Sequence, residues 1–212
     1  MNIVILLGVV VATMALGAPV AYALGFAGLA VLLIDGSTPL FIVVQRMVAS
    51  MDSFTMLAVP LYIFIGQIMN EGGITARIFD FARCLVGHLK GGLAHVNVLC
   101  SVIFAGMSGS ALADTAGLGQ IEVDAMRKEG FPDGFSGAVT AATATIGPII
   151  PPSIPLVLYG GLAEVSIGRL FMAGLGPGVL MGIGFSAMIA FLSHKRGYPV
   201  SERATVSETW RA

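Results

Sequence analysis

Long runs without a charged side chain alternate with short polar stretches along the whole chain. These runs are Met1 to Ile34, Ser53 to Asn70, Gly91 to Ala113, Gly134 to Ala163 and Leu170 to Ser193. A helix needs roughly 20 apolar residues to cross a bilayer, and several of the runs reach that length. The pattern therefore predicts an all-α, polytopic membrane protein.

One apolar run is too short for a crossing helix. Gly92 to Gly106 gives about 15 residues, roughly 22 Å of helix, against a hydrocarbon core of about 30 Å. It leads to "MSGS", after which a second helical stretch extends from Ala111 to about Lys128. We expect the chain to turn back at Ser-Gly-Ser, so that residues 91–130 form a re-entrant helical hairpin.

A second apolar run is interrupted by "GPIIPPSIP" at residues 147–155. Phe135 to Ile146 begins a helix and Leu156 to Leu162 completes the crossing. Each of the four prolines in the interruption lacks a backbone donor, and together they prevent a continuous helix. Residues 131–163 are therefore predicted to form a broken transmembrane helix.

The remaining segments complete a single membrane domain, 1–212. Residues 1–90 are expected to hold scaffold helices and an arm: Ile3 to Ile34 crosses once, either tilted or bent at "GAP" 17–19, and Ser53 to Asn70 crosses next. Residues 74–90 have apolar positions at helical spacing, which fits either an interfacial amphipathic helix or an ordinary connecting helix. The last crossing, 166–193, leads to a cytoplasmic tail, 194–212.

The distribution of basic residues orients this arrangement. If the hairpin turns back and the other segments each cross once, nine of the eleven Lys and Arg residues fall on one side. Cytoplasmic loops carry the excess of Lys and Arg, which places both chain ends and the hairpin base in the cytoplasm. The nine are Arg77, Arg83, Lys90, Arg127, Lys128, Lys195, Arg196, Arg203 and Arg211, against Arg46 and Arg169.

Composition supports a membrane protein and excludes other classes. The chain is 56% hydrophobic and 11% charged, with a mean hydropathy of +0.91. A net charge of −1 leaves no basic surface for nucleic acid. Cys84 and Cys100 show no metal-binding spacing and are expected to be buried thiols without a role.

Both interruptions are edged with hydroxyl groups. Irregular backbone at membrane depth persists only inside protein or around a polar ligand. Gly109 allows a tight reversal, Ser110 is placed to cap the returning helix, and the carbonyls and hydroxyls together suit a small hard cation such as sodium. The hydroxyls are Ser108 and Ser110 at the hairpin, and Thr140, Thr143, Thr145 and Ser153 around the proline break.

Asp114 follows the hairpin tip by about one helical turn. An intramembrane acid is read as functional by default, although it also favours the N-terminal dipole of its helix, and one residue can do both. Glu122, Asp124 and Glu129 are expected on a solvated helix face. Asn97 and Ser101 either face the site or form hydrogen bonds between helices.

An enzyme is not expected. Catalysis at Asp114 would need a second acid or a nucleophile with a positioned base, and the sequence shows no evident candidate. No cofactor is expected, apart from sodium as a coupling ion.

Three stretches resemble one known family. They are "FTMLAVPLYIFIGQIMNEGGI", "KGGLAHVNVLCSVIFAGMSGSALADTAGLGQIEVDAMRKEGF" and "AATATIGPIIPPSIPLVLYG", and they look like the large membrane subunit, DctM type, of tripartite ATP-independent periplasmic (TRAP) transporters. The resemblance implies a sodium-driven elevator permease of the bacterial inner membrane that imports organic acids such as C4-dicarboxylates or sialic-acid-like compounds. It also implies two partners: a periplasmic substrate-binding protein and a small four-helix membrane subunit.

The resemblance also implies a site. The family's hairpin tip corresponds to Ser108, Gly109 and Ser110, and sodium-binding groups are expected around Thr143, Thr145, Gly147, Pro148 and Ser153, with Asp114 nearby. Within this set, the sodium ligands are expected at Ser108, Ser110, Thr145 and Gly147.

The sequence departs from the family in length. Large subunits of this type are about twice as long and contain a second, inverted copy of the hairpin and broken helix, which this sequence lacks. The expectation is therefore the N-terminal half of a transporter, with a missing C-terminal half or second chain as partner. The alternative is a fragment or interaction module that assembles with partner subunits and transports nothing.

Overall fold

The computed structural model describes residues 2–36, 39–51 and 54–200, and within these ranges the chain is all-α without a strand. The predicted fold class is confirmed. The chain consists of two compact units, Met1–Ser53 and Phe54–Ala212. Residues 201–212, which the sequence assigns to the cytoplasmic tail, lie outside the described residues.

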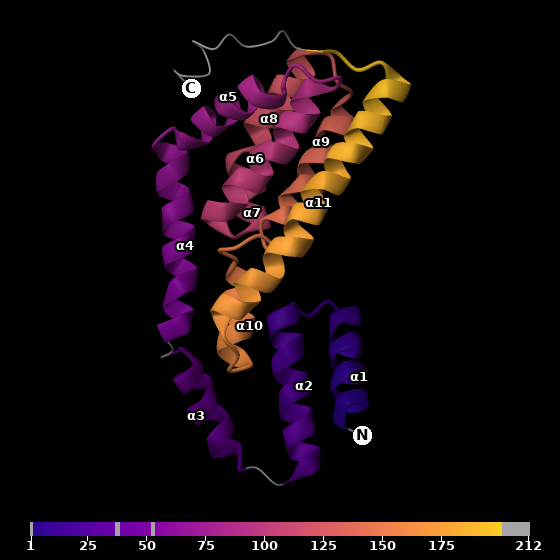
Figure 1. The fold of residues 1–212 in the computed structure, drawn as a ribbon. Coiled ribbons are helices and arrows are strands. Elements are labelled where there is room, and N and C mark those ends of the chain that lie inside the picture. The colour runs from indigo at the N-terminus through magenta and orange to yellow at the C-terminus, as the bar shows by residue number, and fades with distance from the viewer. Residues whose placement is uncertain (1, 37–38, 52–53, 201–212) are drawn as a thin grey trace. The chain divides into compact units, whose positions relative to one another are not determined.

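The first unit begins with a pair of antiparallel helices, α1 (Asn2–Ala15) and α2 (Val20–Asp35), followed by α3 (Leu40–Met51) (Figure 1). Gly17, at φ 85°, turns the chain, and Pro19 precedes α2 with φ −56°. The bend at "GAP" is where the sequence places it, but the interpretation of Ile3 to Ile34 as one crossing is wrong, because α2 folds back along α1. The assignment of basic residues to the two sides of the membrane assumed that this segment crosses once, and that assumption does not hold.

The second unit begins with a bent pair of helices, α4 (Phe54–Glu71) and α5 (Ile74–Val86), whose axes differ by 71°. Gly73 at the bend has φ 73°. Phe79 and Ala82 on α5 are buried, and α5 packs on α6. Most apolar residues that recur at helical spacing in 74–90 are exposed, among them Ile74, Phe81 and Leu85. The helix therefore has a second apolar face besides the one that packs in the protein.

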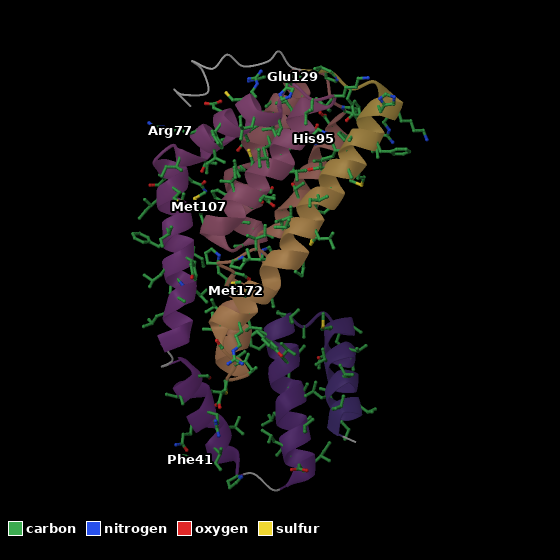
Figure 2. All side chains as sticks on the ribbon, viewed as in Figure 1. Phe41, Arg77, His95, Met107, Glu129 and Met172 are labelled. Carbon is green, nitrogen blue, oxygen red and sulfur yellow. The ribbon has the colours of Figure 1, made fainter. Side chains whose placement is uncertain are left out.

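A helical hairpin forms the centre of this unit. Its first arm, α6 (Gly92–Ser108), is buried along most of its length, and its second arm consists of α7 (Ala111–Gly117) and α8 (Gly119–Lys128). Both parts of the second arm pack against α6. Glu129, at the base of the hairpin, lies at the same end of the unit as Arg77, while Met107 lies near the tip (Figure 2). The chain thus reverses direction at Ser108 to Ser110.

The rest of the unit is a broken helix and a long final helix. α9 (Asp133–Thr143) continues as a short 3-10 turn, Ala144–Ile146, and irregular backbone then extends to α10 (Ile154–Leu162). α11 (Ile167–Arg196) has 30 residues and packs against α6 and α10. Its glycines Gly174 and Gly178 are buried and lie against Ile149 and Ile150 of the break.

The base of the hairpin is tied to the end of α11. The backbone N–H of Gly91 donates to the Pro199 carbonyl at 3.1 Å. The Tyr198 ring lies 5.0 Å from that of Phe131 and 4.7 Å from that of Phe135. These contacts hold the last residues described here against the start of α9.

Within the described residues, α11 is the one helix that is long and apolar enough to cross a membrane by itself, and the bent pair α4 and α5 meets the same test when taken together. The helices α1, α2, α3 and α6 are apolar but shorter. α11 covers the predicted last crossing, 166–193, except for residue 166, which caps the helix. α4 matches the predicted segment Ser53 to Asn70 to within one residue at each end.

Candidate functional site

The turn of the hairpin is built by a glycine and a serine. Gly109 ends α6 in the left-handed region, at φ 61°, and its N–H donates to the Ala105 carbonyl at 3.2 Å. Ser110 is the N-cap of α7: its side-chain oxygen accepts from the N–H of Ala113 at 3.4 Å. Both local predictions, reversal at Gly109 and capping by Ser110, are confirmed.

The proline break is confirmed with slightly shifted bounds. Irregular backbone occupies residues 147–153, and Ser153 then caps α10 by accepting from the N–H of Leu156 at 3.2 Å. The same hydroxyl donates to the carbonyl of Pro148. Ser153 therefore holds the two ends of the break together, which fixes the path of the backbone between them.

The hairpin turn and the proline break are in direct contact. The backbone N–H of Ile154 donates to the Gly109 carbonyl at 3.2 Å. A Cβ added to Gly109 would overlap the Pro152 carbonyl oxygen, and one added to Gly147 would lie 3.2 Å from the Ser110 carbonyl carbon. Two segments distant in the sequence thus meet through their main chains, with no room for a side chain at Gly109 and a tight fit for one at Gly147.

The predicted site residues fall into two groups around this junction. Ser108, Gly109, Ser110 and Gly147 lie at the junction itself, and Ser108 is 1% exposed. Thr145 lies on the 3-10 turn that packs against α7; it is exposed and donates its hydroxyl to the Ala142 carbonyl at 2.5 Å. The second group, Thr143, Pro148 and Ser153, is engaged in hydrogen bonds within the protein.

Thr143 belongs to a buried network that joins α6 to α9. Its hydroxyl donates to the Asn97 side-chain oxygen at 2.5 Å, and the Asn97 amide donates to the Thr140 hydroxyl at 2.7 Å. All three side chains are buried. Of the two interpretations of Asn97, hydrogen bonding between helices is confirmed.

Asp114 lies one turn behind the junction and is 1% exposed. Its N–H donates to the Ser110 carbonyl at 3.1 Å, and the Ser101 hydroxyl lies beside its carboxylate. Neither carboxylate oxygen has a hydrogen bond of ordinary geometry within the described residues. Ser101 thus faces the interior of the hairpin.

The expectation of a solvated face is wrong for Glu122, which is 1% exposed. Leu118 and Met126, four positions away on either side, are also buried, so Glu122 lies in the middle of the buried stripe of α8. The spacing of four residues between Leu118, Glu122 and Met126 is visible in the sequence and indicates a buried position, but the charge of Glu122 suggested exposure to solvent.

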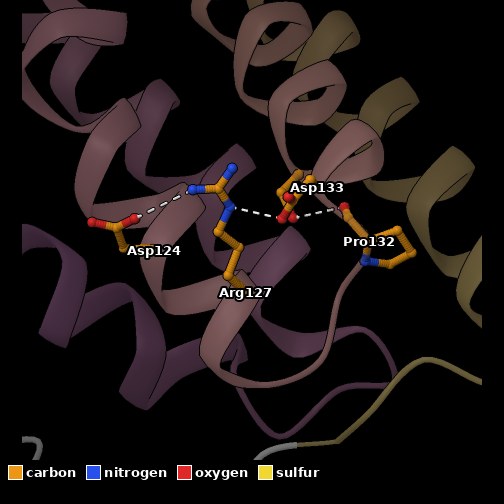
Figure 3. A network of polar contacts seen from close by, with 5 residues as sticks. Asp124, Arg127, Pro132 and Asp133 are labelled. Atoms are coloured by element: carbon orange, nitrogen blue, oxygen red, sulfur yellow. Dashed lines mark hydrogen bonds and ion pairs between the residues drawn. The ribbon is translucent and has the colours of Figure 1, made fainter.

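The other acids near the base of the hairpin form ion pairs. Arg127 lies 2.7 Å from Asp133 and 4.0 Å from Asp124, with all three side chains more than half exposed (Figure 3). Glu129 pairs with Arg83 at 3.3 Å. A solvated face was expected for Glu122, Asp124 and Glu129; it is confirmed for Asp124, while the Glu129 side chain is partly buried, at 23% exposed.

The two cysteines are free thiols. Cys100 is buried on α6 and Cys84 is partly buried on α5. No cluster of three or more metal-binding side chains of His, Cys, Asp or Glu occurs among the described residues.

Comparison with known proteins identifies the family. Residues 7–212 match the family described as the tripartite ATP-independent periplasmic transporter, DctM component. The chain belongs to the DctM family. It is a family of transporter permeases and not of enzymes, as the sequence predicts.

Individual members of the DctM family resemble the chain closely. It is 47% identical over 196 residues to the sialic acid TRAP transporter large permease protein SiaM of Vibrio cholerae, a match that covers 92% of this chain and 46% of SiaM. It is 53% identical over 161 residues to the sialic acid TRAP transporter permease protein SiaT of Haemophilus influenzae, covering 76% and 26% of the two chains. It is 38% identical over 212 residues to the 2,3-diketo-L-gulonate TRAP transporter large permease protein YiaN of Escherichia coli, covering 100% and 50%. The chain therefore spans half or less of the length of these relatives.

Proposed function

We propose that the chain supplies one half of the permease of a sodium-coupled TRAP transporter that imports small organic acids across the inner membrane. In this proposal the hairpin α6 to α8 is re-entrant, and the junction at Gly109 and Ile154 lies at membrane depth. The contact between the two helix breaks is the observation that carries the proposal, since discontinuous helices are the usual setting of coupling-ion sites in transporters.

Oxygen atoms available at the junction suit sodium. Ser110 accepts one hydrogen bond through its hydroxyl and keeps a second lone pair, and a hydroxyl that donates, as that of Thr145 does, keeps both. The Ser108 hydroxyl and the Gly147 carbonyl complete the proposed ligands. Asp114, one turn behind, adds negative charge that favours a cation.

The remaining predicted residues are proposed to support these ligands. Thr143 holds the end of α9 against α6, and Ser153 holds Pro148 and the start of α10. Ligands on irregular backbone keep their geometry only when neighbouring hydrogen bonds fix that backbone. Gly109, which has no side chain, allows the hairpin turn to approach the proline break closely, so that the proposed ligands of the two segments come together.

The proposed substrate class is a small organic acid. The relatives are named for sialic acid and 2,3-diketo-L-gulonate, and both are carboxylic acids. We propose a periplasmic substrate-binding protein, a small four-helix membrane subunit and a further permease half as partners, with the hairpin base on the cytoplasmic side.

Two serine caps provide a matched test of the sodium site. Ser110 caps α7 at the junction, and Ser166 caps α11 elsewhere in the same way. Loss of either cap lowers stability by about 1 kcal/mol. We expect Ser110→Ala and Thr145→Ala, but not Ser166→Ala, to weaken the stabilisation that sodium gives the assembled complex and the sodium dependence of uptake.

Unchanged sodium dependence in both Ser110→Ala and Thr145→Ala would contradict the proposed ligands. A complex that assembles with the partner subunits but takes up no organic acid under a sodium gradient would contradict transport itself. That result would favour a chain that serves only in assembly.

A further inference from the structure

Glu122 is a buried acid that the proposed sodium site does not use. It is 1% exposed, and its Oε1 atom has no hydrogen-bond partner within the described residues. It lies on α8 with Gly119 and Met126 on the same buried side. The carboxyl group is therefore enclosed by the hairpin and not by solvent.

The groups that face Glu122 do not compensate a negative charge. α7 contributes Asp114, whose carboxylate acts electrostatically on Glu122, and α6 contributes the buried Cys100 thiol on the same side. The other titratable residue of α6 is His95, which lines the groove against α11. Asp80 of α5 is a third acid, close enough to act electrostatically on Cys100.

Two basic residues of the same region, Arg127 and Arg83, are paired with other acids. α9 has one charged residue, Asp133, which pairs with Arg127 on the exposed surface. Arg83 pairs with Glu129. The ion pairs of the described residues include neither Glu122 nor Asp114.

An ionised carboxylate in these surroundings is strongly disfavoured. Burial of an unpaired charge costs far more than burial of a hydrogen-bonded neutral group, and a second acid nearby adds repulsion. A proton on Glu122 removes both effects. When α8 separates from α6, water reaches the carboxyl group and the reason to hold the proton disappears.

We propose that Glu122 is a proton-binding site, which holds a proton while α8 is packed on α6 and releases it when the hairpin opens. The ligand is H⁺ itself, so the proposal requires neither sodium nor an organic acid and stands apart from the proposed function. Because proton binding differs between the two arrangements, packing of the hairpin becomes pH-dependent.

Infrared spectroscopy of the full chain in detergent tests the protonation directly. At neutral pH we expect the carbonyl stretch of a protonated carboxylic acid, lost in Glu122→Gln and retained in Asp124→Asn. Asp124 is the matched control because it lies on the same helix with an exposed side chain. Absence of the band from the unchanged chain overturns the proposal, as does its loss in Asp114→Asn but not in Glu122→Gln.

Thermal unfolding as a function of pH tests the consequence. The unchanged chain should lose stability from about pH 4.3, where a free glutamate ionises, and on through neutral pH until Glu122 itself ionises. The unfolding constant grows by up to about tenfold per pH unit for this one proton. Glu122→Gln keeps the shape of the neutral acid and should show a smaller loss over the same range. Glu122→Ala should be less stable at every pH because it leaves a cavity.

The opposite pattern overturns the proposal. If the unchanged chain is insensitive to alkaline pH and Glu122→Gln destabilises at neutral pH, Glu122 is ionised and held by donors. Sodium-dependent uptake is not part of either measurement, so failure of the proposed function leaves these results interpretable.

Discussion

The backbone N–H of Ile154 donates to the carbonyl of Gly109, so the first residue of α10 is hydrogen-bonded to the turn of the hairpin. Each of the two segments is irregular by itself. Together they satisfy one donor and one acceptor that water could not reach in a membrane interior.

Replacement of Gly109 by alanine should destabilise the chain substantially. A left-handed φ of 61° is unfavourable for alanine by about 1 to 2 kcal/mol, and the new Cβ would also overlap the Pro152 carbonyl oxygen. Thermal unfolding of the purified chain measures the loss. Gly130→Ala is the control, because Gly130 has φ 89° but no neighbouring atom within 4 Å. Equal losses in both variants would show that the junction contributes nothing beyond backbone strain.

Two glycines of α11 should respond to alanine with opposite signs. A Cβ at Gly174 would lie 2.6 Å from the Ile149 carbonyl oxygen, which is backbone and has little freedom to move. A Cβ at Gly184 meets no atom within 4 Å, and alanine favours a helix over glycine by about 1 kcal/mol. We expect Gly174→Ala to lower the melting temperature and Gly184→Ala to raise it. A gain in both would mean that α11 does not press against the break.

Removal of Asn97 should weaken the link between α6 and α9. Asn97→Ala removes the donor to the Thr140 hydroxyl and leaves the Thr143 hydroxyl with only carbonyls of its own helix. A buried group left unsatisfied costs about 1 to 3 kcal/mol. A double-mutant cycle of Asn97→Ala with Thr143→Val measures their coupling. Thr115→Ala serves as control, since Thr115 is exposed and bonds only to Ala111 of its own helix. Additive effects of the two network variants would exclude the proposed coupling.

Two buried serines should also differ. The Ser193 hydroxyl has no partner within the described residues, whereas that of Ser136 donates to the Pro132 carbonyl at 3.2 Å. We expect Ser193→Ala to leave stability unchanged or slightly higher, and Ser136→Ala to lower it by about 1 kcal/mol. Chemical unfolding in a fixed detergent compares them. A larger loss for Ser193→Ala would reveal a partner for its hydroxyl.

Helix interruptions were predictable because proline and glycine act locally. Pro148, Pro151 and Pro152 follow one another closely enough to interrupt the helix, and Pro155 stands in the first turn of α10, where proline is tolerated. Gly109 between two serines marks a turn with a cap. The segment at Gly17 and Pro19 carried the same local signal. Its consequence, a reversal of α2 along α1, depends on tertiary packing that a bend alone does not specify.

Side-chain environments were harder to predict than helix ends. The charge of Glu122 indicated solvent, while its spacing from Leu118 and Met126 indicated burial, and packing decided in favour of spacing. For Asn97 the sequence left two interpretations open, because the helix that it faces could not be identified from spacing within α6. Contacts between segments distant along the chain, such as Gly109 with Ile154, have no local signature.

The junction between the hairpin turn and the proline break is formed by main-chain atoms. Its geometry therefore depends on the identity of very few residues, chiefly those where a Cβ has no room. The helix ends that meet there are also fixed by the hydroxyls of Ser110 and Ser153. Side chains that neither form the main-chain contact nor cap a helix can therefore be exchanged to test the proposed solute selectivity without displacing the junction.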